Sequence, residues 1–131
     1  MRIHLDTNLL ISEPRWELLP PGDHEFLVSA LVFAEFSAGT AHPDPDIAAR
    51  ARIDLIQHRS TYGDGVPFSQ READIYRELC FIVATAGRSP RGERRVDLMI
   101  AAIAIGDGAV LATRSTSDFD GLQPLLRLIS L

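Results

Sequence analysis

Four acidic residues draw attention because each one borders or interrupts an apolar segment of the sequence. They are Asp6 after residues 3–5, Glu35 within residues 30–36, Asp97 before residues 98–104, and Asp118 in the loop that follows residues 109–112. Carboxylate oxygens are the ligands that hard cations such as Mg²⁺ prefer. A metal ion held in this way can activate water and neutralise the charge on a phosphodiester. The four acids therefore predict divalent-metal chemistry on a phosphate ester.

The segments that would position these acids alternate between strand-like and helix-like patterns. Short strands are expected at 3–5, 26–28, 66–68, 109–112 and 126–129, and helical segments at 8–11, 29–38, 46–60, 69–86 and 95–106. Ser69 and Glu72 have the pattern of a capping box at the start of one helix. Alternating strands and helices predict a parallel sheet with helices on both faces. We expect a single domain over residues 1–131, an α/β fold that forms a three-layer α/β/α sandwich with a central, mainly parallel sheet.

The positions of the acids within this fold favour a shared site. In open α/β sheets, sites form beyond the carboxyl ends of the strands, where Asp6 and Asp118 fall. Asp97 falls in the first turn of a helix, where the helix dipole favours a negative charge. Glu35 is expected at or near a buried surface, where a carboxylate needs an arginine or a metal ion as its partner.

Helical spacing also predicts which side chains of one helix lie together. Ala49, Ile53 and Ile56 recur at this spacing within residues 46–60, with the arginines of the segment elsewhere on its surface. His4 alternates with apolar neighbours in the first expected strand, and is therefore expected to be a packed histidine rather than a metal ligand.

The composition excludes several other chemistries. All 13 basic residues are arginine, and the absence of lysine removes P-loop, Schiff-base and phospho-receiver mechanisms. The one cysteine, Cys80, cannot form an internal disulfide and is expected to be a buried structural thiol. No apolar run has membrane-spanning length and the first residues lack a signal-peptide pattern, so we expect a cytoplasmic protein without a membrane partner.

The arginines provide a candidate surface for RNA. The net charge of −5 argues against nucleic-acid binding over the whole surface, but not against a local basic patch. The candidates for such a patch are Arg88, Arg91, Arg94 and Arg95, in and after a turn-rich loop, and Arg114. These side chains could clamp phosphates beside the metal, or they could be solvated or paired with acids.

Four segments together resemble the motifs of PIN-domain ribonucleases, and in particular of the VapC toxins. The segments are Leu5–Ile11, Val32–Gly39, Arg95–Ala102 and Leu111–Phe119. Each motif alone is weak, but the four occur in the family's order over nearly the whole chain. The resemblance therefore implies the PIN-type fold and a shared metal site.

The resemblance also implies a role for individual residues. The catalytic, metal-binding acids would be Asp6, Glu35 and Asp97, and the supporting residues would be Thr7, Asn8, Thr113 and Ser115. The family often has Asn or Asp where this chain has Ser115, and a serine hydroxyl is a poor metal ligand. Asp118 then becomes the candidate fourth acid. The number of bound metal ions, one or two, remains open.

An activity and two partners follow from the same resemblance. It implies an endoribonuclease that uses Mg²⁺ or Mn²⁺, forms a homodimer and is neutralised by a VapB-like antitoxin. One rival is a PIN-like module that has lost catalysis and only binds RNA or a protein. The other is a phosphatase with an aspartyl nucleophile, which requires a second aspartate where this chain has Asn8.

Overall fold

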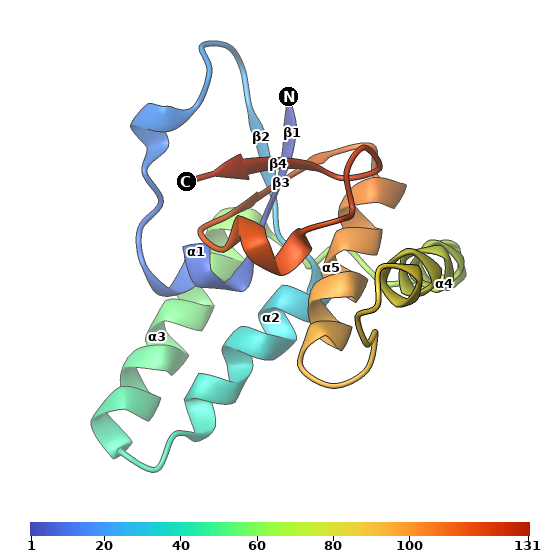
Figure 1. Cartoon of the computed structure of the whole chain (residues 1–131). Coiled ribbons are helices and arrows are strands. Elements are labelled where there is room, and N and C mark those ends of the chain that lie inside the picture. The colour runs from blue at the N-terminus through green and yellow to red at the C-terminus, as the bar shows by residue number, and fades with distance from the viewer.

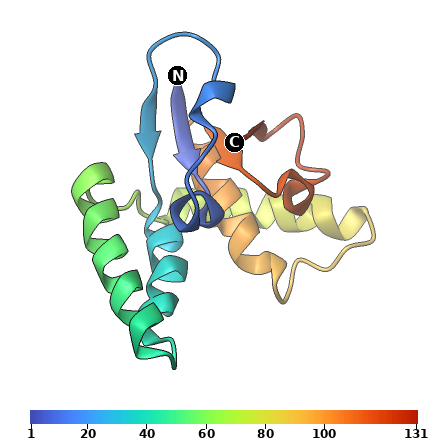
Figure 2. The same ribbon diagram turned by 90° about the vertical axis from the view of Figure 1, so that its left-hand side faces the viewer.

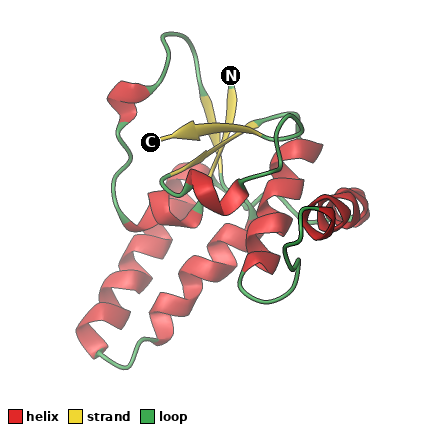
Figure 3. Ribbon diagram, viewed as in Figure 1, coloured by secondary structure: helices red, strands yellow, loops and turns green.

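The centre of the fold is a four-stranded sheet in which every strand pairing is parallel. The computed structural model describes all residues 1–131. The strands are β1 (Arg2–Leu5), β2 (Glu25–Leu27), β3 (Val110–Thr113) and β4 (Arg127–Ser130), in the spatial order β2–β1–β3–β4. Ile3 pairs with both Phe26 and Val110, which sets the register at the middle of the sheet. The predicted α/β fold with a central parallel sheet is confirmed (Figure 3).

Five α-helices and three 3₁₀ turns surround the sheet. They are α1 (Thr7–Ile11), α2 (Ala30–Ser37), α3 (Pro45–Tyr62), α4 (Gln70–Thr85), α5 (Arg94–Gly106), η1 (Trp16–Leu18), η2 (Ala38–Ala41) and η3 (Thr116–Phe119). Figure 1 shows α1, α2 and α3 in one group and α4 with α5 in another, and the perpendicular view in Figure 2 shows the same division. Helix α2 also packs against α5 and so joins the two groups. None of these helices combines the length and the apolar character needed to cross a lipid bilayer.

Side chains at the helix starts explain why the helices begin where they do. Ser29 Oγ accepts a hydrogen bond from the main-chain N–H three residues further on, at 3.1 Å. Asp44 caps α3, whose first residue is Pro45. The predicted capping box of α4 is confirmed, since a Glu72 carboxylate oxygen accepts the N–H of Ser69 at 2.9 Å. Each cap satisfies a main-chain donor that the helix itself leaves free.

Two expectations about local structure are wrong, and the helical spacing in α3 does not mark its buried face. Ile53 and Ile56 are 51% and 70% exposed, because α3 packs along α2 and η2 and buries Ala48. Val66 forms a single parallel bridge with Ser29, so residues 66–68 are not a strand. Cys80 is half-buried, because α4 packs mainly on α5 and leaves its other faces at the surface.

Helix α5 is anchored along its length and at its C-terminal end. Its residues Leu98 and 100–104 are buried, and the helix packs against β3 and α4. Beyond its last turn, an Asp107 carboxylate oxygen contacts His4 Nε2 at 2.8 Å and accepts a hydrogen bond from Arg2 Nη2 at 2.9 Å. His4 is 1% exposed, which confirms it as a packed histidine, and burial lowers its pKa although Asp107 opposes the effect. These contacts join the end of α5 to β1.

Candidate active site

Asp6 lies directly after β1 and is the N-cap residue of α1. The residue is 6% exposed, and both of its carboxylate oxygens accept hydrogen bonds. Oδ1 accepts the N–H of Thr7 at 2.8 Å, and Oδ2 accepts the hydroxyl of Thr113 at 2.7 Å. Burial raises the pKa of Asp6, while these two hydrogen bonds lower it. The two hydrogen bonds therefore hold the Asp6 carboxyl group in one orientation, while its burial disfavours the ionised form.

The hydroxyl of Thr113 has a fixed direction because of its other partners. Its oxygen accepts a hydrogen bond from Asn8 Nδ2 at 3.2 Å and another from the N–H of Ser115 at 3.0 Å. A threonine hydroxyl has one hydrogen to donate. With both acceptor positions in use, that hydrogen points to Asp6 Oδ2. Asn8, Thr113 and Ser115 thus form one network that orients Asp6.

Glu35 does not occupy the buried position that its apolar surroundings in the sequence predict. It is exposed, because α2 buries Val32, Phe33 and Phe36 and turns Glu35 outward. Its Oε1 accepts a hydrogen bond from Thr7 Oγ1 at 2.6 Å. The partner of Glu35 is therefore the first residue of α1, and no arginine is required.

Asp97 shows that the four acids lie within electrostatic reach of one another. It is half-buried in the first turn of α5, as predicted. Burial, followed by the negative charges of Asp6, Asp118 and Glu35, raises the pKa of Asp97 to about 6, although Arg94 opposes the rise. Folding therefore gathers acids from β1, α2, α5 and η3 at one place. The like charges disfavour the ionised form of Asp97 unless a cation joins them.

The donor set suits a hydrated hard cation. All four acids offer oxygen ligands, but no group of three His, Cys, Asp or Glu side chains lies close enough together to hold one metal ion. Mg²⁺ usually binds through one or two carboxylates and keeps several water molecules, so it does not need three ligands already in place. The chemistry of the four donors therefore suits Mg²⁺ or Mn²⁺.

The fourth motif contributes the more exposed part of the site. Asp118 is exposed in η3, and its N–H donates to the main-chain oxygen of Ser115 at 3.0 Å. The charge of Asp118 raises the pKa of both Asp6 and Asp97, so Asp118 lies near them. Ser115 contacts the network through its main chain, and none of the hydrogen bonds involves its hydroxyl. Asp118 therefore remains the candidate fourth acid.

The five candidate RNA-binding arginines differ in their surroundings. Arg91 and Arg95 are exposed, and Arg88 is exposed with its Nη1 donating to the main-chain oxygen of Asp120 at 3.2 Å. Arg114 donates from Nη2 to the carbonyls that follow α1, those of Ser12 at 3.2 Å and of Glu13. The guanidinium of Arg114 is thus engaged in fixing α1, while a role in RNA binding stays a prediction.

A groove of about 470 Å³ runs beside the acids, between α1, α2 and α3. Thr7 and Glu35 form the wall shared with the site, and the groove continues over the apolar side chains of Ile11, Phe36 and Ile47. No pattern in the sequence predicts this groove, because its lining comes from separate helices. Two of the apolar side chains that line it, Ile11 and Ile47, are 72% and 49% exposed.

Replacing Thr113 with valine is expected to reduce the free energy of unfolding by about 2–3 kcal/mol. The change removes the donor to Asp6 and leaves Asn8 Nδ2 and the Ser115 N–H without their acceptor. Urea denaturation in EDTA measures the loss. The matched control is Thr61→Val on the exposed side of α3, where the hydroxyl only donates to a carbonyl of its own helix. An equal effect of the two changes would contradict the network.

No protein-family model matches the sequence, and no curated protein matches it. Solved structures, in contrast, match the whole fold. With VapBC-5 from Mycobacterium tuberculosis, of the VapBC family of toxin-antitoxin systems, the chain shares 24% identity over 99% of this chain and 97% of that one, with a TM-score of 0.80. VapBC2 from Rickettsia felis, in a structure bound to a DNA fragment from the promoter, shares 22% identity with the chain. The match covers 100% of this chain and 99% of that one, with a TM-score of 0.78. The chain has the fold of the VapC-type PIN toxins.

A third comparison supports the same VapC-type fold. FitAcB from Neisseria gonorrhoeae is 25% identical, with 97% of this chain and 96% of that chain covered and a TM-score of 0.73. These likenesses cover both chains almost completely, so the VapC-type fold accounts for the whole of residues 1–131. The fold explains why Asp6 and Asp97, 91 positions apart in the sequence, lie close enough for the charge of Asp6 to raise the pKa of Asp97.

Proposed function

We propose that this chain is a Mg²⁺-dependent endoribonuclease and the toxin of a VapBC-like pair. The observation that carries the proposal is the gathering of four carboxylates, since burial and then the charges of Asp6, Asp118 and Glu35 raise the pKa of Asp97 to about 6. The VapC-type fold supports it, because the similar solved structures are toxin-antitoxin complexes. Mn²⁺ would serve as a substitute, since it takes the same oxygen ligands.

Each residue of the site would have a separate role in the hydrolysis of RNA. Hydrolysis joins the oxygen of water to phosphorus, breaks one P–O ester bond and transfers a proton to the leaving oxygen. A bound divalent ion would supply the activation of water and the neutralisation of phosphate charge. Asp6 and Asp97 would hold the ion, with Thr113 keeping Asp6 oriented through its 2.7 Å hydrogen bond. Thr7 would keep the Glu35 carboxylate turned toward the same place through its 2.6 Å hydrogen bond.

The proposal includes a protein partner. The similar structures are complexes of VapB and VapC proteins, and we propose a VapB-like antitoxin for this chain as well. The groove beside the site supports a protein partner, because its floor carries the apolar side chains of Ile11, Phe36 and Ile47, while the charge of Asp54 at its edge is paired with Arg50. A homodimer and a cytoplasmic location belong to the same proposal.

Two observations favour a second candidate function, a PIN-like module that binds RNA or a protein without cutting it. Ser115 stands where the family often has a metal ligand, and no three ligands are already assembled. Such a module would bind Mg²⁺ weakly and would leave RNA intact. The four acids argue against it, since a binding module gains nothing from their repulsion.

Purified protein is expected to cut single-stranded or looped RNA with Mg²⁺ or Mn²⁺ and to leave it intact in EDTA. The reason is that the acids need a divalent ion to approach an anionic substrate. Gel analysis of end-labelled RNA measures cleavage, and a short antitoxin encoded in a neighbouring reading frame should stop it when added. Intact RNA in the presence of metal would favour the binding module, and equal cleavage in EDTA would exclude the metal mechanism.

A further inference from the structure

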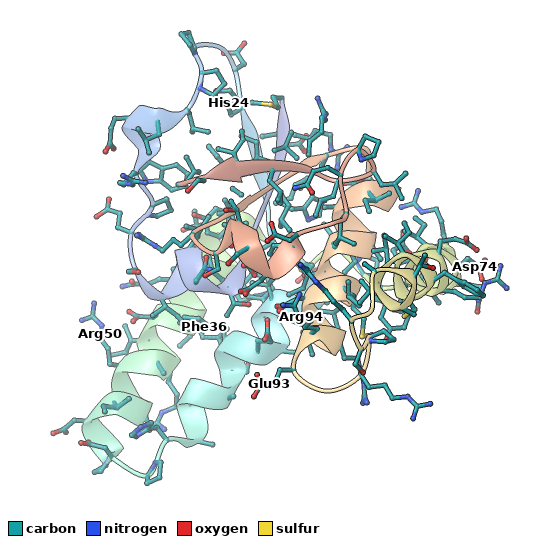
Figure 4. The ribbon with its side chains drawn as sticks, viewed as in Figure 1. His24, Phe36, Arg50, Asp74, Glu93 and Arg94 are labelled. Atoms are coloured by element: carbon teal, nitrogen blue, oxygen red, sulfur yellow. The ribbon has the colours of Figure 1, made fainter.

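Arg94 differs from the other candidate RNA-binding arginines in its position. It is the first residue of α5, one turn before Asp97, and it is half-buried whereas the other four are exposed. Figure 4 shows its side chain turned into the space between α5, α2 and η3. Its Nη1 lies 3.5 Å from the main-chain oxygen of Asp118, which it contacts as a donor. Arg94 therefore sits at the rim of the carboxylate site itself.

The charge of Arg94 acts on the site while most of its donors are free. It lowers the pKa of Asp97 against the effect of three acids, and no other arginine acts on Asp97 in this way. A guanidinium has five N–H donors, and only one of those of Arg94 is used. The remaining donors are available to a ligand that approaches the acids.

The charge balance of the site favours a cation of this kind. A single divalent ion would offset only half of the charge of the four carboxylates, and RNA would bring further negative charge to the same place. Arginine binds phosphate oxygens through paired N–H donors, which a point charge cannot do. Arg114 cannot replace Arg94 here, because its guanidinium is engaged with the carbonyls after α1.

We propose that Arg94 binds the phosphate that is cleaved and stabilises the negative charge that develops on it. The proposal rests on the nuclease function proposed above, and it assigns a substrate-contacting role to one residue of this chain. The other arginines of the loop would then contact flanking phosphates and contribute to binding alone.

The test compares Arg94→Ala, Arg94→Lys and the control Arg127→Ala in the full-length protein. Arg127 is exposed at the start of β4, opposite Val110, and so at the end of the sheet away from the site. Two quantities are measured: kcat/KM for a labelled single-stranded RNA with Mg²⁺, and the Kd of the same RNA in EDTA by fluorescence anisotropy. The second measurement needs neither metal nor catalysis.

Arg94→Ala is expected to lower kcat/KM about 100-fold or more, as for the loss of one donor to a transition-state anion, and to raise the Kd several-fold. Arg94→Lys should restore the Kd but not kcat/KM, and Arg127→Ala should change neither. If Arg94→Ala behaves like Arg127→Ala in both measurements, the proposal is overturned. If Arg94→Ala fails to fold, Arg94→Lys decides, because full activity of the lysine variant would remove the need for paired donors. If the wild type does not cut RNA, the nuclease proposal fails, and an unchanged Kd for Arg94→Ala would then overturn the phosphate site separately.

Discussion

Replacing Asp97 with asparagine is expected to abolish RNA cleavage while leaving the protein folded. Asparagine keeps the size of the side chain but removes the charge that would hold the metal ion. We expect a loss of at least about 100-fold in kcat/KM, the scale on which one charged group acts on a phosphate transition state. The melting temperature in EDTA should rise rather than fall, because Asp97 is repelled by Asp6, Asp118 and Glu35 in the metal-free protein.

The matched control for this experiment is Asp74→Asn. Asp74 is exposed on the outer side of α4, away from the acids, as Figure 4 shows. The control variant removes the same charge and should keep wild-type cleavage. Cleavage by Asp97→Asn at the wild-type rate would contradict the metal site, whatever the effect on stability.

Mg²⁺ is expected to raise the melting temperature of the wild type strongly at pH 7 and weakly at pH 5. The pKa of Asp97 is about 6 in the folded protein and 3.8 in its unperturbed state. In the metal-free protein, the folded state therefore binds a proton in this window that the unfolded state has released, and stability falls as the pH rises through it. At pH 7, where Asp97 is ionised, a bound metal ion would offset the repulsion between the carboxylates and restore this stability. An ion at one hundred times its Kd adds about 2.7 kcal/mol, or roughly 8 °C for a domain of this size.

Asp97→Asn is also the control for the effect of pH. Burial lowers the pKa of His4, which by itself reduces stability as the pH falls, and the difference between wild type and variant cancels this contribution. In EDTA the variant should be more stable than the wild type at pH 7, and the two should converge at pH 5. The same stabilisation by Mg²⁺ in both proteins would place the metal away from Asp97.

Much of the fold could be predicted because local chemistry determines where its elements begin and end. Ser69 and Glu72 mark the start of α4 through hydrogen bonds between near neighbours. Short apolar runs separated by turn residues indicate the strands, and alternation with helices indicates a parallel sheet. The spacing of apolar residues in α3 did not indicate its buried face, because the helix packs only along α2 and η2 and leaves most of its surface free. Which face it buries depends on those neighbours and not on the periodicity alone.

The site was predictable to the extent that its acids border regular elements. Asp6 and Asp97 follow from the end of a strand and the start of a helix, and both lie where the sequence places them. Glu35 was expected at or near a buried surface because its neighbours in the sequence are apolar. In the structure it lies on the exposed side of α2. The hydrogen bonds from Thr113 to Asp6 and from Arg114 to Ser12 connect residues more than one hundred positions apart. Only tertiary packing can bring such partners together.

The anchoring of α5 has a consequence for how the site would change when an ion enters. Its last turn is tied to β1 through Asp107, His4 and Arg2, and its body is packed against β3 and α4. In the proposed metal site, Asp97 would therefore be a stationary ligand, and so would Asp6, whose two carboxylate oxygens already accept hydrogen bonds. The movement needed to complete a coordination shell would then fall mainly to the exposed turn that carries Asp118, because Glu35, although exposed, is held by its hydrogen bond from Thr7. Binding of the ion would draw this turn toward a rigid pair of carboxylates.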